Sequence, residues 1–332
     1  MGATRVIITA GAFWACFGAV VIVFLFHISL GSKSIPIETV WTALVAPEDG
    51  AFEHVIVREL RMPRALFVIF VGASLSVAGA ILQGVTNNPL AEIEILGLGA
   101  GASFAVVIGI GWFELTSLAY VPLASALGTL GGAALVLVIA SAAPGGSRPL
   151  NLVLAGAAVA SFLYSLQACA FLLQGDLFDE FRLWLSGSFS GRKMESFIWA
   201  LPWFVVGLSA ALLISRQITT LAMGDETAVG LGLNILRIKL VAYAIVVALT
   251  AASIAMAGPI GFVGLVIPHA VRLFAGADYR LIVPFSMLVG GCFLLIADIA
   301  ARLVLAPLEM STGIITAMFG APVFIWLVRS KL

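Results

Sequence analysis

Asp298 and Arg302 are charged residues within an apolar stretch near the C-terminus, and they lie four residues apart. On a helix this spacing places both side chains on one face, so we expect an ion pair that offsets the cost of burying charge. A buried aspartate of this kind could instead titrate and carry a proton or an ion. His269 has apolar immediate neighbours and no second ligand, which favours a hydrogen-bonding role in helix packing over a metal site.

Three arginines recur at every third position before the second apolar stretch, namely Arg58, Arg61 and Arg64. On one helical or extended turn they can share a face and bind carboxylates of a docking protein, because guanidinium groups pair well with carboxylates. Arg302 could join them from the later stretch. The alternative is that these side chains only anchor the chain at the membrane interface.

A polar segment with helix-capping residues lies over residues 221–232, between two later apolar stretches. Gly224 and Asp225 can begin a short helix, and Gly232 can end it. The acidic side chains of Asp225 and Glu226 favour the N-terminal end of the helix dipole. Such a helix on the membrane surface is a rigid handle for a soluble partner, although an ordinary loop helix has the same caps.

Several catalytic and nucleotide-binding motifs are absent from the sequence. No GxxxxGKS/T phosphate loop occurs, so we do not expect the chain to hydrolyse ATP itself. No HExxH motif occurs and no GxSxG lies at a nucleophile turn, so no protease centre is expected. Cys16, Cys169 and Cys292 are isolated in apolar runs and are expected to pack as free thiols. The sequence therefore predicts no enzyme activity and no metal or cofactor on this chain.

The elements that carry these residues must lie in a membrane. Of the 332 residues, 62% are hydrophobic and 10% are charged, with a mean hydropathy of +1.16. Soluble domains carry about 25% charged residues. No polar stretch is long enough for a soluble domain, so we predict a single transmembrane domain over residues 1–332. The 17 basic residues balance the 17 acidic ones, which gives no indication of nucleic acid binding.

Ten apolar stretches approach the length of about 17 to 25 residues that crosses a bilayer as a helix. The first runs for roughly 25 residues after Arg5, longer than the apolar core of a cleavable signal, so we interpret it as a span. The eighth is expected to be short or re-entrant, because Gly258 and Pro259 break any helix before it. The predicted spans are residues 6–30, 64–83, 95–113, 118–142, 150–174, 197–215, 236–257, 260–275, 281–303 and 312–328.

An even number of spans places both termini on one side of the membrane, but the basic residues of the connections divide almost equally between the two sides and hardly decide which side is the cytoplasm. The largest polar connection, over residues 216–235, is flanked by Arg216, Arg237 and Lys239. We therefore expect this segment, together with both termini, in the cytoplasm. The remaining basic residues then make the outer face unusually positive.

A weak internal repeat relates residues 78–91 to residues 257–270, which share Ala-Gly-x-Ile and, further on, Pro-x-Ala. An odd number of predicted spans separates the two copies, so a true repeat would be inverted in the membrane, as in many transporters. The predicted fold is therefore an all-α, polytopic membrane protein with about ten transmembrane helices and an inverted internal repeat.

Several motifs of the chain resemble those of the FecCD-type permeases of type II ABC importers. The resemblance runs from residue 55 to near the C-terminus, and the motifs agree in both order and spacing. They are RMPR (61–64), GASL (72–75), GAILQG (79–84), NPLA (88–91), LG (96–97), GPIGFVGLVIPH (258–269), AD (297–298) with AR (301–302), and GAP (320–322).

The resemblance implies a permease subunit that works by alternating access within an ATP-binding-cassette importer of the inner cell membrane. Its partners would be two cytoplasmic ATPase subunits, which bind ATP and Mg²⁺, and a periplasmic or lipid-anchored substrate-binding protein. A second permease chain, identical or a sister, would complete a dimer. The substrate would pass along the dimer axis beside the fifth and tenth spans.

The resemblance also implies which residues contact these partners. Arg61, Arg64 and Arg302 match outer arginines that pair with acidic residues of the binding protein, which would explain the basic outer face. The capped polar segment matches the region that docks the ATPase. Its ATPase-coupling residues would be Gly224, Asp225, Glu226, Ala228 and Gly232.

A cytoplasmic gate is a further implication of the resemblance. Asn88 and Leu90 match one part of the gate in cobalamin-type relatives. The other part lies at the start of the fifth span, where relatives often carry Ser or Thr. Here Pro149 and Leu150 stand at that place.

The segment over residues 184–192, WLSGSFSGR, resembles the ferric-siderophore branch of the family more than the cobalamin branch. This favours an iron chelate as the substrate. Haem and cobalamin are alternatives within the same class of importer. An alternative of another class is an ion-coupled secondary transporter, with Asp298 as the titrating group and the inverted repeat as its scaffold.

Overall fold

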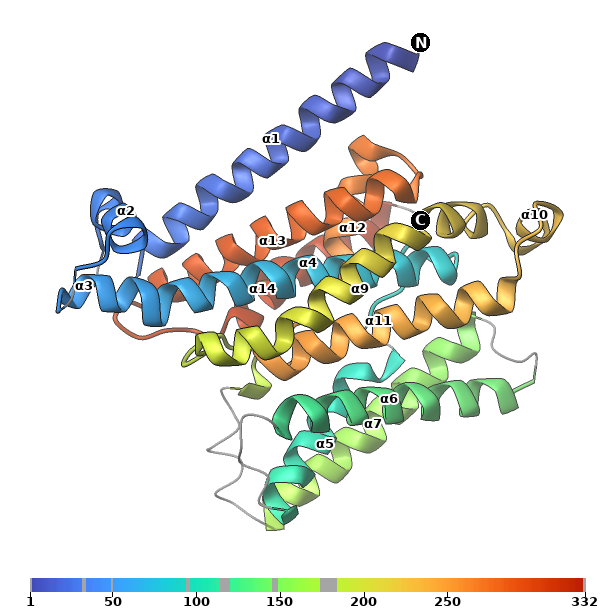
Figure 1. Cartoon of the computed structure of the whole chain (residues 1–332). Coiled ribbons are helices and arrows are strands. Elements are labelled where there is room, and N and C mark those ends of the chain that lie inside the picture. The colour runs from blue at the N-terminus through green and yellow to red at the C-terminus, as the bar shows by residue number, and fades with distance from the viewer. Residues whose placement is uncertain are drawn as a thin grey trace.

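The computed structural model describes residues 2–31, 34–48, 50–93, 96–113, 120–144, 149–173 and 184–330. Within these ranges every regular element is a helix, and the helices lie roughly side by side in one bundle (Figure 1). The all-α prediction is confirmed.

Each predicted span corresponds to a helix in the described ranges. In the part of the chain that the structure describes, seven helical stretches are long and apolar enough to cross a membrane, whereas α5, α12 and the apolar part of α14 are shorter. The chain is thus an all-α, polytopic membrane protein. The helices are α1 (Gly2–Ser29), α4 (Met62–Val85), α5 (Leu98–Phe113), α6 (Tyr120–Ala142), α7 (Pro149–Leu173), α9 (Met194–Leu221), α11 (Ile235–Ala257), α12 (Val263–Ala275), α13 (Tyr279–Leu303) and α14 (Thr312–Ser330).

The connection between α1 and α4 contains helical structure that the sequence analysis did not predict. It forms α2 (Ile37–Val45), α3 (Phe52–Val55) and η1 (Ile56–Arg61), a π-helical turn that leads directly into α4. These elements are too short to stand out as apolar periods. They pack around Val40 and Val57, which are buried together with the end of α1.

The centre of the bundle is α4, most of whose residues are buried. It packs against α13 and α12 through small residues: a side chain at Gly72 would collide with the backbone of Gly290, and one at Gly79 with Gly264. The hydroxyl of Ser76 also donates to the Ser286 carbonyl oxygen at 2.7 Å. Such close approach of helix backbones is a usual means of association inside a membrane.

The predicted break before the eighth span is confirmed. α11 ends at Ala257 and α12 begins at Val263, with Gly258 in a positive-φ conformation between them. Across the bundle, residues 78–91 and 257–270, the two copies of the suggested repeat, lie against each other, and the Gln83 side chain donates to the Gly264 carbonyl oxygen at 3.1 Å. The inverted relation of the two segments stays a prediction.

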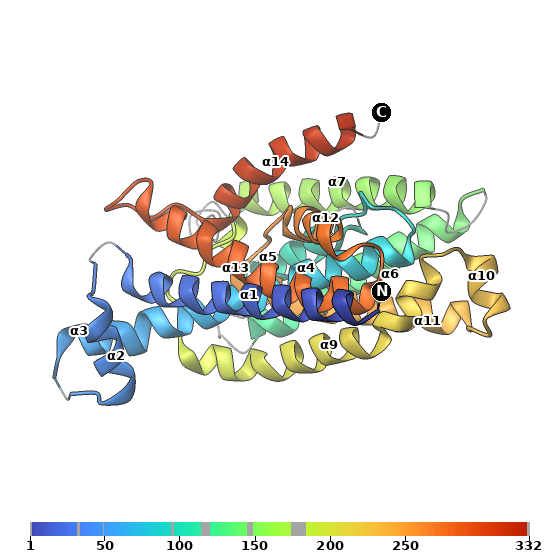
Figure 2. The same cartoon turned by 90° about the horizontal axis from the view of Figure 1, so that it is seen from above.

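The bundle has two distinct ends (Figures 1 and 2). One end carries α2 and α3, and the opposite end carries α10 (Asp225–Gly230). The start of α1 and the end of α14 both lie toward the end that carries α10. In Figure 1, α5, α6 and α7 form a group along one side of the bundle.

Candidate functional sites at the two ends of the bundle

A buried aspartate organises the end that carries α2 and α3. Asp298, in the last turns of α13, is fully buried, and Arg64 donates to both of its oxygens, at 2.9 and 3.0 Å. Thr312 donates to Oδ1 at 2.6 Å, and His27 Nε2 lies 2.8 Å from Oδ2. Four elements, α1, α4, α13 and α14, therefore meet at one carboxylate. Because both oxygens are occupied, the group is poorly suited to carry a transported ion.

The predicted pair of Asp298 and Arg302 forms, but at 3.4 Å it is the looser contact of this aspartate. Arg302 instead donates to the carbonyl oxygens of Leu30 at 2.9 Å and His27 at 3.0 Å. Arg64 is the main partner, 234 residues away in the chain. Helical spacing can reveal only pairs within one helix, so it could not have found this one.

The last carbonyl groups of α1 are bound by arginines. Arg61 donates to the carbonyl oxygens of Ile28 and Ser29, both at 2.7 Å. These oxygens lie at the C-terminal end of a helix, where they have no partner within the helix and where a positive charge is favourable. Arg61 and Arg302 thus fasten the end of α1 to the last residue of η1 and to α13.

The structure constrains the predicted binding-protein contacts. Arg61, Arg64 and Arg302 are 8%, 9% and 4% exposed, and their guanidinium groups face partners inside the chain, including Glu309, which Arg64 binds at 2.7 Å. The expected common face with Arg58 is wrong, because Arg58 is exposed while Arg61 and Arg64 turn inward. Their role in docking stays a prediction. We call this set, His27, Arg61, Arg64, Asp298, Arg302, Glu309 and Thr312, the charge cluster.

The capped segment at the other end forms the expected short helix, α10. Gly224 precedes it with a φ of 109°, and Gly232 follows it with a φ of 80°, conformations that favour glycine. Ala228, within α10, is fully buried. Lys239 of α11 binds Asp225 at 2.9 Å. The helical prediction is confirmed, and the helix is fixed to α11 from its first residue.

The structure connects α10 to the rest of the bundle through the end of α9. Thr219 of α9 donates to Asp278 at 3.1 Å and accepts from the backbone N–H of Tyr279 at 2.9 Å. Hydrogen bonds from the Arg280 side chain hold the pKa of Asp278, which lies just before α13, below its ordinary value. The Asn87 side chain approaches the Leu221 carbonyl oxygen at 3.5 Å.

The predicted gate residues lie in two places. Asn88 and Leu90 belong to the turn after α4, where the Asn88 side chain accepts from the Leu90 N–H at 3.0 Å. Pro149 and Leu150 form the first turn of α7, and Leu150 is exposed on the single chain. The structure therefore assigns the two halves of the predicted gate to different elements, and their gating role stays a prediction.

The segment over residues 184–192 joins two helices that are distant in the sequence. The Ser188 N–H donates to the Ala257 carbonyl oxygen at 2.8 Å, at the end of α11, and the Gly313 N–H donates to the Gly187 carbonyl oxygen at 3.0 Å, at the start of α14. A side chain at Gly258 would collide with the Trp184 carbonyl oxygen. The segment is thus packed tightly against the break between α11 and α12.

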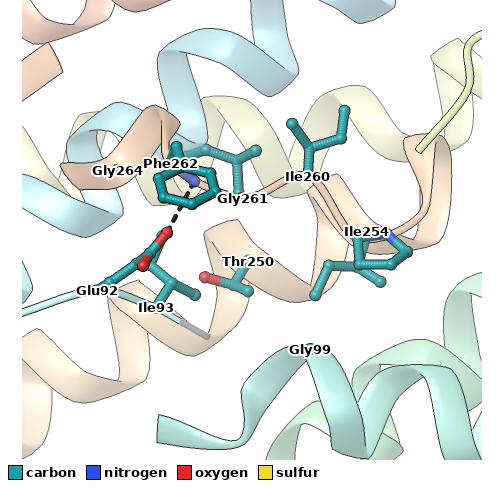
Figure 3. A pocket seen from close by; sticks show the side chains of 11 residues that line it. Glu92, Ile93, Gly99, Thr250, Ile254, Ile260, Gly261, Phe262 and Gly264 are labelled. Atoms are coloured by element: carbon teal, nitrogen blue, oxygen red, sulfur yellow. Dashed lines mark hydrogen bonds between the residues drawn. The ribbon is translucent and has the colours of Figure 1, made fainter. Parts of the chain in front are cut away.

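A small cavity lies behind the gate turn and contains a glutamate to which the sequence analysis gave no role (Figure 3). Glu92 Oε1 accepts from the backbone N–H of Phe262 at 2.7 Å. Burial raises the pKa of the Glu92 carboxyl, and this hydrogen bond opposes the rise. Among the described residues, no group of three or more His, Cys, Asp and Glu side chains is arranged to hold a metal ion.

The chain is thus an apolar helical bundle with a capped helix at one end and a buried charge cluster at the other. Comparison with known proteins gives the family. The model of the FecCD transport family matches residues 19–330, and the chain belongs to this family.

Relatives cover nearly the whole chain. It is 40% identical to the iron(3+)-hydroxamate import system permease protein FhuB of Bacillus subtilis (strain 168) over 98% of this chain and 83% of the relative. It is 42% identical to the Fe(3+)-citrate import system permease protein YfmD of the same organism, over 85% and 83%. A solved inward-facing structure of a metal-chelate type ABC transporter superposes with a TM-score of 0.85 at 27% identity, covering 97% of this chain and all of that one.

The family decides between the classes of protein considered above. The chain is a permease subunit of an ABC transporter, a class of subunit that is not an enzyme and has no cofactor of its own. The alternative of an ion-coupled secondary transporter, with Asp298 as its titrating group, is therefore wrong. The occupied oxygens of Asp298 agree with this outcome.

Proposed function

We propose that this chain carries a ferric siderophore across the inner membrane, by alternating access, as the permease of an ATP-driven importer. The observation that carries the proposal is the agreement of relatives that are named for ferric chelates of different chemistry, hydroxamate and citrate. The sequence over residues 184–192 points in the same direction. Haem and cobalamin are the alternative cargoes.

The proposed arrangement in the membrane has ten spans with both termini in the cytoplasm. It is supported by the position of the start of α1 and the end of α14 toward the end that carries α10 (Figures 1 and 2). α12, with 13 residues, is too short to cross alone at about 1.5 Å per residue. Together with the more extended residues of the break before it, at up to about 3.3 Å per residue, it would complete the crossing.

The proposed docking site for the cytoplasmic ATPase is α10 and its flanks. Met223, Val229 and Leu231 are large apolar residues that are more than half exposed there. Apolar side chains that gather at the end of a bundle, outside the predicted spans, are typical of a protein-binding surface. The buried Ala228 and the Lys239–Asp225 pair would transmit movement of the docked ATPase to α9 and α11.

Charge reversal on α10 tests this site. Replacing Asp225 and Glu226 together with lysine is expected to abolish chelate-stimulated ATP hydrolysis by the assembled importer, because it reverses the charge that the ATPase meets. The variant protein should still insert in the membrane. Unchanged coupling between chelate and hydrolysis would contradict the proposal. Glu38→Lys, an exposed acid on α2 at the opposite end, is the matched control.

The proposed role of Arg61, Arg64 and Arg302 in docking the binding protein is indirect. Because these arginines bind carbonyl and carboxylate oxygens inside the chain, they would fix the shape of the docking surface rather than leave their partners. Arg58, exposed on η1, would supply a direct contact to acidic residues of the binding protein.

A second permease chain, identical or a sister, is proposed to cover α7 and α14. α7 exposes several large apolar side chains, among them Leu150 of the predicted gate, and α14 exposes Met318 and Phe319. In the dimer these helices would line the path of the substrate, and the gate at Asn88, Leu90, Pro149 and Leu150 would close it toward the cytoplasm.

Uptake into proteoliposomes tests the function as a whole. The importer, assembled with its ATPase and binding protein, should accumulate a radiolabelled ferric siderophore only when ATP is present, and an ion gradient should not replace ATP. A parallel series with haem and cobalamin identifies the cargo. Accumulation of either of these, with none of a hydroxamate or citrate chelate of iron, would overturn the siderophore assignment.

A further inference from the structure

The hydrogen bond from Phe262 to Glu92 joins two breaks in the helical structure (Figure 3). Glu92 lies in the connection between α4 and α5, and Phe262 lies in the break between α11 and α12. The two residues are 170 positions apart, and the donor–acceptor distance is 2.7 Å.

Phe262 holds an unusual position at the start of α12. It adopts a left-handed conformation with a φ of 68°, which is rare for a residue with a large side chain. Its carbonyl oxygen accepts the first helical hydrogen bonds, from Leu265 and Val266. Its own N–H, by contrast, is bound by the Glu92 carboxylate. A negative charge at this place is also favoured by the dipole of the helix.

The ring of Phe262 reaches the proposed wall of the substrate path. A side chain at Gly320, in the middle of α14, would collide with the Phe262 ring, so the two helices approach each other closely here. Any change in the backbone at Phe262 therefore acts directly on α14.

Glu92 directly follows the turn at Asn88 and Leu90 that forms one part of the predicted gate. The Ala91 N–H donates to the Asn88 carbonyl oxygen at 3.1 Å, and the Asn88 side chain accepts from Leu90. The residues from Asn88 to Ala91 thus form one compact turn, and the next side chain along the chain is the carboxylate that binds Phe262.

The cavity beside Glu92 leaves the carboxylate room to change its contacts. Its free space of about 10 Å³ admits about one water molecule. The Thr250 hydroxyl of α11 lines the same cavity, is fully buried and makes no hydrogen bond to any residue that the structure describes. Glu92 is the only charged side chain among the described residues that line the cavity, so no other charge competes for the Phe262 N–H.

We infer that Glu92 is a positioning residue for transport, whose hydrogen bond to Phe262 holds the gate turn at Asn88 and Leu90 in register with α14. The inference rests on the proposed function, because the gating role of Asn88 and Leu90 is part of that function. The hydrogen bond between Glu92 and Phe262 does not depend on which cargo is carried, so its effect on the structure can be measured without a transport assay.

The experiment compares Glu92→Ala, which removes the acceptor, with Glu92→Gln, which keeps an oxygen at the same place. Spin labels on Leu90→Cys and Met318→Cys, in a background without Cys16, Cys169 and Cys292, report the distance between gate turn and α14 in the assembled importer. The wild type and Glu92→Gln should give one narrow distance distribution, and Glu92→Ala a clearly broader one. Equal distributions for all three would overturn the inference.

Uptake per ATP hydrolysed gives a second readout that a merely structural role would not move. In Glu92→Ala this ratio should fall by about tenfold while hydrolysis continues, since a hydrogen bond to a charged group is lost. Glu92→Gln should recover most of the ratio. A ratio in Glu92→Ala equal to the wild type, or equal losses in the two variants, would contradict the inference. Failure of the wild-type importer to take up any chelate would count against the proposed function. The spin-label distances would still decide whether Glu92 holds the gate turn in register with α14.

Discussion

The two ends of the bundle differ in how their charges are placed. At the end that carries α2 and α3, Asp298 is fully buried and binds Arg64, His27 and Thr312. At the α10 end, Lys239 and Asp225 form an ion pair that is open to water, with side chains 29% and 50% exposed.

This difference has a direct energetic meaning. Breaking a buried ion pair leaves an uncompensated charge and costs several kcal/mol, whereas an exposed pair contributes little. The charge cluster therefore fixes α1, α4 and α13 relative to one another, while the exposed ion pair at the start of α10 contributes little. We expect the first end to stay fixed during transport and the second to move.

The largest expected effect is that of Asp298→Ala. The change removes the common acceptor of Arg64, His27 and Thr312, and the free energy of unfolding should fall by about 3 to 5 kcal/mol. Thermal unfolding of the purified protein in detergent measures this as a lower melting temperature.

Thr312→Val is the matched control, because it removes one neutral donor while Arg64 and His27 stay on the same carboxylate, and it should cost only about 2 kcal/mol. If Asp298→Ala melts at the same temperature as the wild type, the cluster does not hold this end together.

A smaller effect is expected for Arg61→Ala. The carbonyl oxygens of Ile28 and Ser29 would lose a charged donor, which should cost about 2 kcal/mol in unfolding free energy. Arg58→Ala, only three residues away but exposed, should leave the melting temperature unchanged and instead weaken affinity for the binding protein. If Arg58→Ala lowers the melting temperature and Arg61→Ala only weakens affinity for the binding protein, the inward orientation of Arg61 is incorrect.

Acid unfolding should sharpen the comparison at the α10 end. Because the folded-state pKa of Asp278 is lowered, its contribution is present above the unfolded-state value of about 3.9 and is lost as the pH falls through the folded-state value. Arg280→Ala removes the largest cause of this shift. The midpoint of acid unfolding should therefore move slightly toward higher pH, and a move toward lower pH would contradict the assignment.

The smallest effect is expected for Lys239→Ala. Loss of its exposed pair with Asp225 should change the unfolding free energy by less than about 1 kcal/mol. If the melting temperature of Lys239→Ala falls as far as that of Asp298→Ala, the two ends do not differ in the strength of their ion pairs.

The sequence allowed prediction of features that depend on neighbouring residues. Among the described residues, apolar stretches predicted a helix for each of the ten expected spans, Gly258 and Pro259 predicted the break before α12, and Gly224 with Gly232 predicted approximate bounds for α10. Each of these signals acts within a few residues of the structure it determines, so one sequence is sufficient to detect it.

Contacts between distant segments were not predictable in the same way. Arg64 and Asp298 are 234 residues apart, and Glu92 and Phe262 are 170 apart. Nothing in the spacing of Arg58, Arg61 and Arg64 indicates that the first faces water while the other two turn inward. That outcome depends on where α1 and α13 end, which is a property of the folded bundle.

Hydrogen–deuterium exchange in the assembled importer, with and without ATP, tests the central difference most directly. Residues 86–93 and 224–232 should change their exchange when ATP binds, whereas residues 24–30 and 298–303, which belong to the charge cluster and its neighbours, should not. The account is contradicted if ATP alters exchange in the charge cluster and leaves α10 and the gate turn unchanged.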